Sequence, residues 1–146
     1  MLNTTISVIV PVYHGKKYIK KLINQIEQCK KKAGNEVTVE LVLSNDAPDD
    51  KLDNYISDLI SICVLNTNEN RGMQGARIKG IQKCKGEYVL MLELDYLISE
   101  DYFKSQLKTI FEKDGDVCVC RAKSENKLAY NVQRPFEIIN DLDYAL

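Results

Sequence analysis

Short apolar runs alternate with amphipathic helical patterns along almost the whole chain, and this alternation restricts the fold more than any other feature. The β-branched runs predict strands buried on both faces, and the apolar residues between them recur at helical spacing. Strands are expected at residues 6–12, 37–44, 62–65, 88–92 and 117–120, and helices at residues 18–33, 48–60, 73–85 and about 99–111. This order predicts an α/β sandwich of three layers around a mainly parallel sheet.

Local signals set the expected ends of these helices. Gly34 ends the first helix, and Pro48 opens the second with two acidic residues against the helix dipole. Ser99 is the predicted N-cap of the last helix. We expect strand 6–12 at the centre of the sheet, between strands 37–44 and 88–92.

Composition narrows the class of protein. A chain of 146 residues that is 45% hydrophobic, with a formal net charge of −1, suits one compact domain and excludes a disordered one. An isoelectric point of about 5.9 gives no overall field for nucleic acid, and no apolar run approaches the roughly 20 residues that span a bilayer. The five cysteines show no C-x-x-C spacing and are expected as buried hydrophobes. We expect a cytoplasmic protein.

Basic residues are concentrated between Lys16 and Lys32, where seven lysines face only Glu27 as an opposing charge. The segment is typical of the solvated face of an amphipathic helix, which we favour. The alternative is peripheral contact with anionic lipid at the inner face of a membrane.

Polar residues follow the predicted strands at the edge where ligands bind in parallel sheets. Asp46 follows the second strand and precedes the predicted helix cap, so capping does not explain it. Glu93 and Asp95 follow the fourth strand and point the same way in an extended segment, an arrangement that suits Mg²⁺ or Mn²⁺ beside phosphate. The helix that begins near Gly72 offers free N–H groups, although no G-x-G-x-x-G or Walker A spacing is present.

Four segments together resemble the family 2 glycosyltransferases of GT-A fold. Residues 6–13 are similar to the opening strand S-V-I-I-P-V-Y-N, and residues 45–48 stand where the family has D-D-G-S. Residues 70–81 resemble N-x-G-x-x-x-A-R-N-x-G-I, and residues 85–95 resemble K-G-E-Y-I-L-F-L-D-x-D. The resemblance implies a GT-A (Rossmann-like) fold and a single nucleotide-sugar-binding domain over residues 1–146.

The resemblance also implies a role for each matching site residue. Those expected around the nucleoside and its phosphates are Pro11, Val12 and Tyr13 in the base pocket, Asp46 hydrogen-bonded to the base, Asn70 and Gly72 beside the nucleoside, and Arg77 near it or the diphosphate. Asp95 is implied as ligand of a Mg²⁺ or Mn²⁺ ion, with Glu93 near the ribose, a metal-bound water or the metal itself.

The chain departs from the family pattern at several positions. Glu93 replaces an Asp of the metal motif, Asn45 replaces the first Asp of D-D-G-S, and Tyr96 stands where a further Asp is common. His14 replaces an Asn and is expected to line a loop rather than to catalyse. The family's second half supplies the acceptor site, so we expect a domain truncated on that side, which binds a donor without measurable transfer and forms a homodimer.

The predicted function is inverting transfer of a sugar from a nucleotide-diphosphate sugar, with a UDP-sugar favoured, to a saccharide or lipid-linked acceptor in polysaccharide biosynthesis. The alternative is a non-catalytic module that binds a nucleotide sugar or a protein. No residue is assigned as the catalytic base, since Asp141 and Asp143 match no motif. Tyr13, Asp46 and Asp95 are expected to converge on one edge of the sheet.

Overall fold

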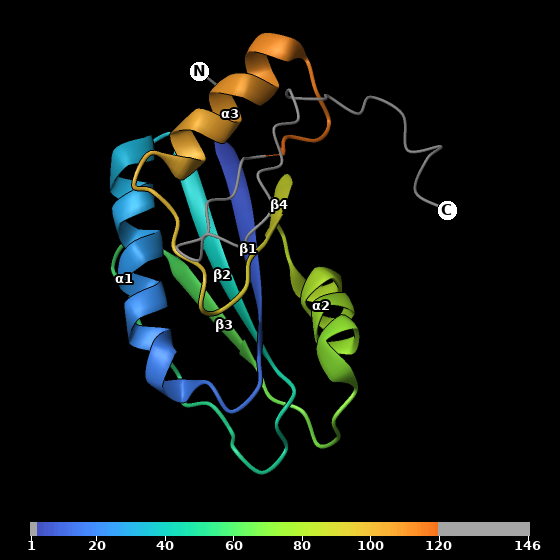
Figure 1. Ribbon diagram of the computed structural model, residues 1–146. Coiled ribbons are helices and arrows are strands. Elements are labelled where there is room, and N and C mark those ends of the chain that lie inside the picture. The colour runs from blue at the N-terminus through green and yellow to red at the C-terminus, as the bar shows by residue number, and fades with distance from the viewer. Residues whose placement is uncertain (1–2, 120–146) are drawn as a thin grey trace, which may run out of the picture. The chain divides into compact units, whose positions relative to one another are not determined.

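The computed structural model describes residues 3–119 of a chain that divides into two compact units, residues 1–101 and 102–146 (Figure 1). The first unit holds a sheet and two helices, in the order β1 (Thr4–Val12), α1 (Lys16–Ala33), β2 (Val37–Asn45), β3 (Ser61–Leu65), α2 (Gly72–Lys83) and β4 (Tyr88–Met91). The second unit contains α3 (Tyr102–Lys113).

The four strands form one parallel sheet in the order β3-β2-β1-β4. β1 therefore lies between β2 and β4, as predicted. Val12 pairs with Asn45 at the end of β2, and Ile9 pairs with Met91 at the end of β4. Because the strands run the same way, the loops that follow them meet at one edge of the sheet. The α/β class predicted from the sequence is confirmed.

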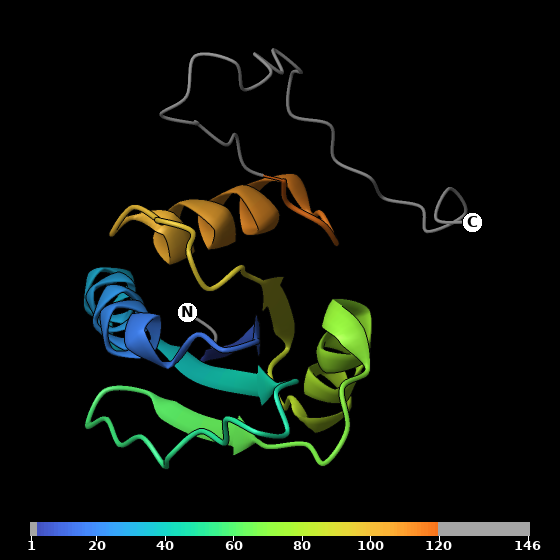
Figure 2. The same ribbon diagram turned by 60° about the horizontal axis from the view of Figure 1, so that its bottom comes forward.

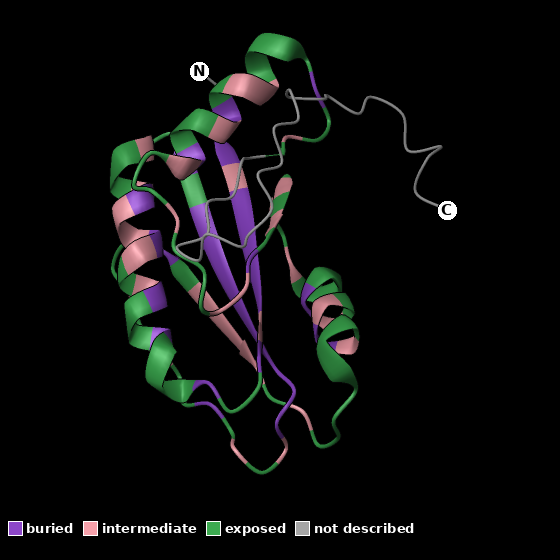
Figure 3. Cartoon of the chain, in the orientation of Figure 1, coloured by how far each residue is buried: buried purple, intermediate pink, exposed green. Residues whose placement is uncertain are grey.

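The two helices of the first unit lie on opposite faces of this sheet (Figure 2). α1 buries Ile19, Leu22 and Ile26 against one face, and it ends before Gly34 as predicted. On the other face Gly80 of α2 lies directly over Ile9, since a Cβ at Gly80 would come within 2.4 Å of that side chain. Covered on both sides, β1 and β2 are buried along nearly their whole length (Figure 3).

The lysine-rich face of α1 lies toward solvent, the arrangement that the amphipathic pattern predicts. Six of its seven lysines are exposed, and Glu27 accepts a hydrogen bond from Ser57 Oγ at 2.6 Å. Contact of this face with lipid stays a prediction. Within residues 3–119, no helix combines the length and apolar character that crossing a membrane requires.

The predicted helix at residues 48–60 is wrong, because this segment is irregular after a turn at Pro48. Its backbone groups are engaged by side chains: Asn66 bonds both the N–H and the C=O of Leu52, and Ser57 Oγ accepts from the N–H groups of Leu59 and Ile60. Asp, Asn and Ser dominate the polar positions and have low helix propensity because their side chains compete in this way. The apolar spacing alone was therefore misleading.

The predicted fifth strand is also wrong within the described residues. Residues 117–119 form no strand, Val119 is exposed, and Cys120 lies outside the described residues. Ser99 does not cap the last helix, which begins at Tyr102; the Ser99 carbonyl instead accepts from the Cys29 thiol at 3.2 Å. A short alternating run is a weak strand signal because pairing with a neighbour, not local pattern, completes a strand.

A buried polar cluster joins β1, β2 and the turn before β4. Ser7 Oγ donates to Glu40 Oε2 at 2.6 Å, and the same carboxylate oxygen accepts from Lys85 N at 2.9 Å. Gly86 N donates to Ser7 Oγ at 2.8 Å. Buried carboxylates are stable only when hydrogen-bonded, so Glu40 depends on these partners. A side chain at Gly86 would meet Ser7 N at 2.5 Å, which explains the glycine of the K-G-E-Y segment.

We predict that Gly86→Ala destabilises the protein, because the added methyl group must displace backbone at the centre of this cluster. The expected loss is about 1–3 kcal/mol or more in the free energy of unfolding, measured by urea denaturation. Glu87→Ala, at the exposed neighbouring position, is the control and should change stability by less than about 0.5 kcal/mol. Equal stability of the Gly86 variant and the parent would contradict this account of the turn.

Candidate functional site

The end of β1 supplies residues of different exposure. Val12 is buried, and its carbonyl accepts from Asp46 N at 2.8 Å, so its contribution at this edge is architectural. Pro11 is half-buried and pairs with Ser44 of β2. Tyr13 is 60% exposed, and its ring meets that of His14 edge to face, with centroids 4.4 Å apart. Of the three predicted base-pocket residues, Tyr13 is therefore the one whose side chain is exposed to solvent.

Asp46 joins the end of β2 to the start of α2. The residue is buried, its backbone N–H is bonded to Val12, and its Oδ1 accepts from Arg71 N at 2.8 Å. No described residue bonds its Oδ2. The Asp46 carboxylate thus bonds the loop before α2 through Oδ1, and its Oδ2 is available to accept from a further donor.

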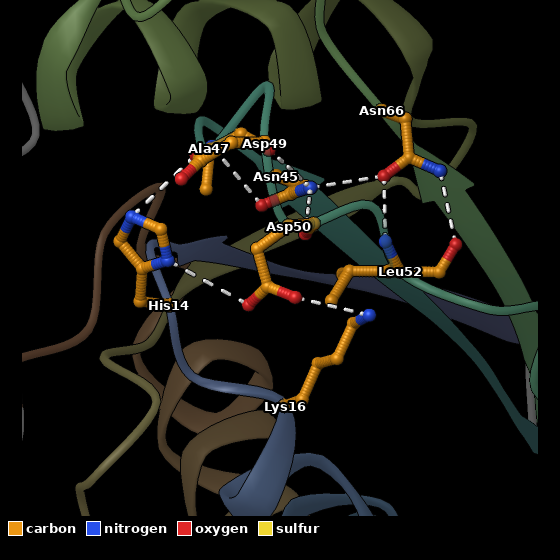
Figure 4. A network of polar contacts seen from close by, with 8 residues as sticks. All are labelled: His14, Lys16, Asn45, Ala47, Asp49, Asp50, Leu52 and Asn66. Atoms are coloured by element: carbon orange, nitrogen blue, oxygen red, sulfur yellow. Dashed lines mark hydrogen bonds and ion pairs between the residues drawn. The ribbon is translucent and has the colours of Figure 1, made fainter.

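Asn45, the residue before Asp46, lies at the centre of a hydrogen-bonded network (Figure 4). Its Nδ2 faces the carbonyls of Ala47 and Asp50 and the Oδ1 of Asn66, at 3.2, 3.0 and 2.9 Å, and its Oδ1 accepts from Ala47 N at 3.2 Å. A carboxylate at this position has no hydrogen to donate. The replacement of the family's Asp by Asn therefore has a structural reason in this chain.

The acids after Pro48 bind the loop after β1 instead of starting a helix (Figure 4). The two ring nitrogens of His14 lie 3.6 Å from Asp49 Oδ1 and 3.7 Å from Asp50 Oδ2, and Lys16 Nζ lies 3.0 Å from Asp50 Oδ1. The hydrogen bond with Asp50 raises the pKa of Lys16 above its ordinary value of 10.5. His14 lines this loop contact, as expected.

A tight turn with polar side chains leads into the first helical turn of α2. Asn70 Oδ1 accepts from Gly72 N at 2.9 Å, and Gly72 has a φ of 75°, which a residue with a side chain seldom adopts. The motif residues Asn70 and Gly72 therefore shape the helix start. Their predicted proximity to a nucleoside stays a prediction.

Arg77 of α2 forms an ion pair with Glu93, just after β4. Both side chains are about one-quarter exposed, and the contact runs from the Arg77 guanidinium to Glu93 Oε1. Arg77 Nε is buried and has no partner among residues 3–119. The pair brings two of the predicted site residues together across 16 positions of sequence.

Asp95 presents an exposed carboxylate for which no hydrogen bond or ion pair to another described residue is found. Asp95 lines a small cavity of about 70 Å³ between α1 and the segment after β4. In the lining of this cavity, Gln25 Nε2 of α1 donates to the Tyr96 carbonyl oxygen at 3.2 Å. Residues 3–119 hold no cluster of three or more His, Cys, Asp or Glu side chains suited to a metal ion. An Mg²⁺ ion that takes phosphate and water for its other ligands needs only one or two carboxylates, and the Asp95 carboxylate fits that role.

A larger cavity of about 690 Å³ opens between the β3–α2 loop and α2, and Asp46 lies in its wall. The sequence prediction missed several polar residues that line it, namely Asn68, Lys79, Gln82 and Lys83. Lys79, Gln82 and Lys83 are spaced three and four apart along α2, which was a signal that could have found them, whereas Asn68 lies in the preceding loop. Asp95 does not line this cavity, so the structure does not bring Asp46 and Asp95 into one pocket. Asp141 and Asp143 lie outside the described residues.

We predict that the Arg77–Glu93 pair contributes measurably to stability. Arg77→Met or Glu93→Gln alone should each reduce the free energy of unfolding by roughly 1–3 kcal/mol, because each leaves a part-buried polar partner. The double variant should lose less than the sum of the single variants, and urea denaturation of all four proteins measures this coupling. Additive losses would show that the two side chains act independently.

The comparisons with known proteins agree on one family. The glycosyltransferase GlyA of Streptococcus pneumoniae serotype 4 is 28% identical over 130 residues, which are 87% of this chain and 18% of GlyA. The poly(ribitol-phosphate) beta-N-acetylglucosaminyltransferase TarS of Staphylococcus aureus (strain Mu50) is 31% identical over 122 residues, 82% of this chain and 21% of TarS.

A solved structure shows the same fold. The crystal structure of S. aureus TarS 1–349 superposes with a TM-score of 0.57 at 22% identity, over 77% of this chain and 34% of that one. The chain thus spans well under half the length of the relatives it matches, for example 39% of GlyG from the same pneumococcal strain as GlyA. The sequence model of "Glycosyl transferase family 2" matches residues 7–143, nearly the whole chain, and the protein belongs to that family.

Proposed function

We propose that this chain is the donor-binding domain of a glycosyltransferase that transfers a sugar, with inversion, from a nucleotide-diphosphate sugar to an acceptor hydroxyl. The relatives support transfer as the reaction, since eight of them are named for glycosyl transfer or teichoic acid biosynthesis. Two of the names state phosphate-bearing acceptors, poly(ribitol-phosphate) and dolichyl-phosphate. A saccharide or lipid-linked acceptor at the cytoplasmic side of a membrane fits that range.

The observation that carries the proposal is the set of carboxylate and guanidinium groups at the carboxyl edge of the sheet. The Arg77–Glu93 pair joins α2 to the segment after β4, and the exposed Asp95 follows two residues later. Sugar transfer leaves a nucleoside diphosphate, so negative charge develops on the leaving group as the glycosidic bond breaks. A guanidinium and a divalent cation at one edge stabilise such charge.

Asp95 would hold the Mg²⁺ or Mn²⁺ ion, which would supply positive charge against the negative charge of the leaving diphosphate. Glu93 is less suited to that role because Arg77 already neutralises its carboxylate. We assign Glu93 to the ribose hydroxyls or to a metal-bound water. The carboxylates of Asp95 and Glu93 then each need only one of their two oxygens for the proposed contact.

Asp46 would recognise the base. One oxygen is bonded to Arg71 N, and the other can accept from a base N–H such as that of uracil, which favours a UDP-sugar. The exposed Tyr13 ring offers a face on which a base can stack. This assignment keeps base recognition and metal binding on separate residues, so mutations can separate them.

A second function is a binding module that holds a nucleotide sugar without catalysis. The observation in its favour is that Glu93, in the first position of the metal motif, is longer than Asp and is paired with Arg77. The two functions share donor binding and differ in transfer. Assays with a panel of donors and sugar acceptors therefore distinguish them, with Asp95-dependent transfer as the mark of the enzyme.

We predict that UDP binding is strengthened by Mn²⁺ and that the two proposed roles separate by mutation. In calorimetric titrations, Asp95→Asn should abolish the gain from Mn²⁺, whereas Asp46→Asn should weaken UDP binding roughly tenfold or more with or without Mn²⁺. Asp46→Asn retains an oxygen to accept from Arg71 N, so the loop contact is preserved. Glu100→Gln, an exposed acid in the same segment as Asp95, is the charge-matched control.

Two results of these titrations would contradict the assigned roles. If the parent binds neither UDP nor other nucleoside diphosphates with Mn²⁺, the donor-binding function is wrong. If all variants bind as tightly as the parent, these carboxylates serve only the fold.

A further inference from the structure

Asn66 has its side-chain orientation fixed by the backbone of Leu52. Leu52 N donates to Asn66 Oδ1 at 2.9 Å, and Asn66 Nδ2 donates to the Leu52 carbonyl at 3.0 Å. Turning the amide over would place two donors together and two acceptors together, so only one orientation satisfies both backbone groups. Asn66 therefore presents an oxygen, not a nitrogen, to Asn45.

The oxygen of Asn66 in turn fixes the chemistry required at position 45. Asn45 is 2% exposed, and its Nδ2 faces three acceptors while its Oδ1 accepts from Ala47 N. An Asp side chain of the same shape would place a carboxylate oxygen against three oxygens in a buried position. Such a group loses its hydrogen bonds and is repelled as well, which is among the costlier changes in a protein interior.

The network holds the loop that carries Asp46. Asn45 bonds the carbonyls of residues 47 and 50, while Asp46 is bonded to Val12 O and Arg71 N. At the outer end Asp50 contacts His14 and Lys16. Because hydrogen bonds hold Asp46 and the residues on both sides of it, the Asp46 side chain presents its Oδ2 in a defined direction.

We infer that Asn45 and Asn66 form a positioning pair for base recognition, and that their hydrogen bonds set the direction in which Asp46 presents its free oxygen to the base of a nucleotide. This inference rests on the proposed function and deepens it, because it concerns selectivity for the nucleoside and not affinity for the diphosphate. Both asparagines also line the larger cavity beside Asp46, and the role assigned to them here is positioning, not contact with the nucleotide. Both act through Asp46.

The test is Asn45→Asp, with Asn54→Asp as the matched control, since Asn54 is exposed and adds the same charge by the same chemical change. Affinities for UDP with Mn²⁺ and for inorganic pyrophosphate with Mn²⁺ are measured by calorimetry. We expect Asn45→Asp to weaken UDP binding about tenfold or more and to leave pyrophosphate binding within about twofold, because only the base contact depends on Asp46. The control should change neither by more than about twofold.

A loss that is equal for UDP and pyrophosphate would show a general structural role and would overturn the inference. Unchanged UDP binding by Asn45→Asp would overturn it as well. If circular dichroism shows that Asn45→Asp does not fold, Asn66→Ala takes its place, because Asn66 is exposed and the substitution removes its contacts to Asn45 and Leu52. The same selective loss of UDP binding is expected.

Failure of the proposed function has a different signature. It appears as a parent protein that binds no nucleoside diphosphate. Hydrogen exchange then decides whether the pair positions the loop at all: Asn45→Asp should speed exchange of the amides in residues 46–52 and leave those of β1 and α1 unchanged. Unchanged exchange in residues 46–52 would overturn the positioning role independently of any ligand.

Discussion

β1 is hydrogen-bonded along both edges and covered on both faces, and the loops that carry Asp46 and Glu93 are attached to it. β2 pairs with it from Thr4 to Val12, and β4 pairs with it from Ile6 to Ile9. Beyond the paired residues, the chain after each neighbour stays bonded to β1, through Asp46 N to Val12 O and Leu92 N to Ile9 O. A strand held on four sides cannot shift its register without breaking all of these contacts, so the two site loops leave the sheet at fixed positions.

Burial explains which parts of the fold the sequence could predict. β1, β2 and α1 carry apolar residues at the period of their own structure, and each buries most of them, so a local pattern was sufficient. α2 differs, because its large apolar residues Met73, Ile78 and Ile81 are exposed and its buried residues are the small Ala76 and Gly80. The segment at residues 48–60 also carries apolar residues at helical spacing, yet Ile56 is 90% exposed. Its conformation depends on Asn66 and Glu27, which lie far away in sequence, and no local pattern contains that information.

The same distinction applies to the site. The rule that ligands bind at the carboxyl ends of parallel strands located Asp46, Glu93 and Asp95 at one edge, as the strand order bears out. The sequence could not show that Arg77 neutralises Glu93, or that Asp46 bonds a backbone N–H of the next helix. It also missed the wall of the larger cavity, because Lys79 and Lys83 resemble ordinary solvent-facing residues of a helix.

The departures from the family motifs act together on the charge of this edge. Asn45 is neutral where an acid is usual, Glu93 is paired with Arg77, and Asp50 is paired with Lys16. Of the three acids assigned to the site, Asp46 and Asp95 form no ion pair within residues 3–119. A diphosphate brought to an edge lined by unpaired acids would be repelled by each of them, and the repulsion would grow as water is excluded. Pairing of Glu93 with Arg77 and of Asp50 with Lys16 lowers this repulsion, so the arrangement is compatible with the donor binding proposed above.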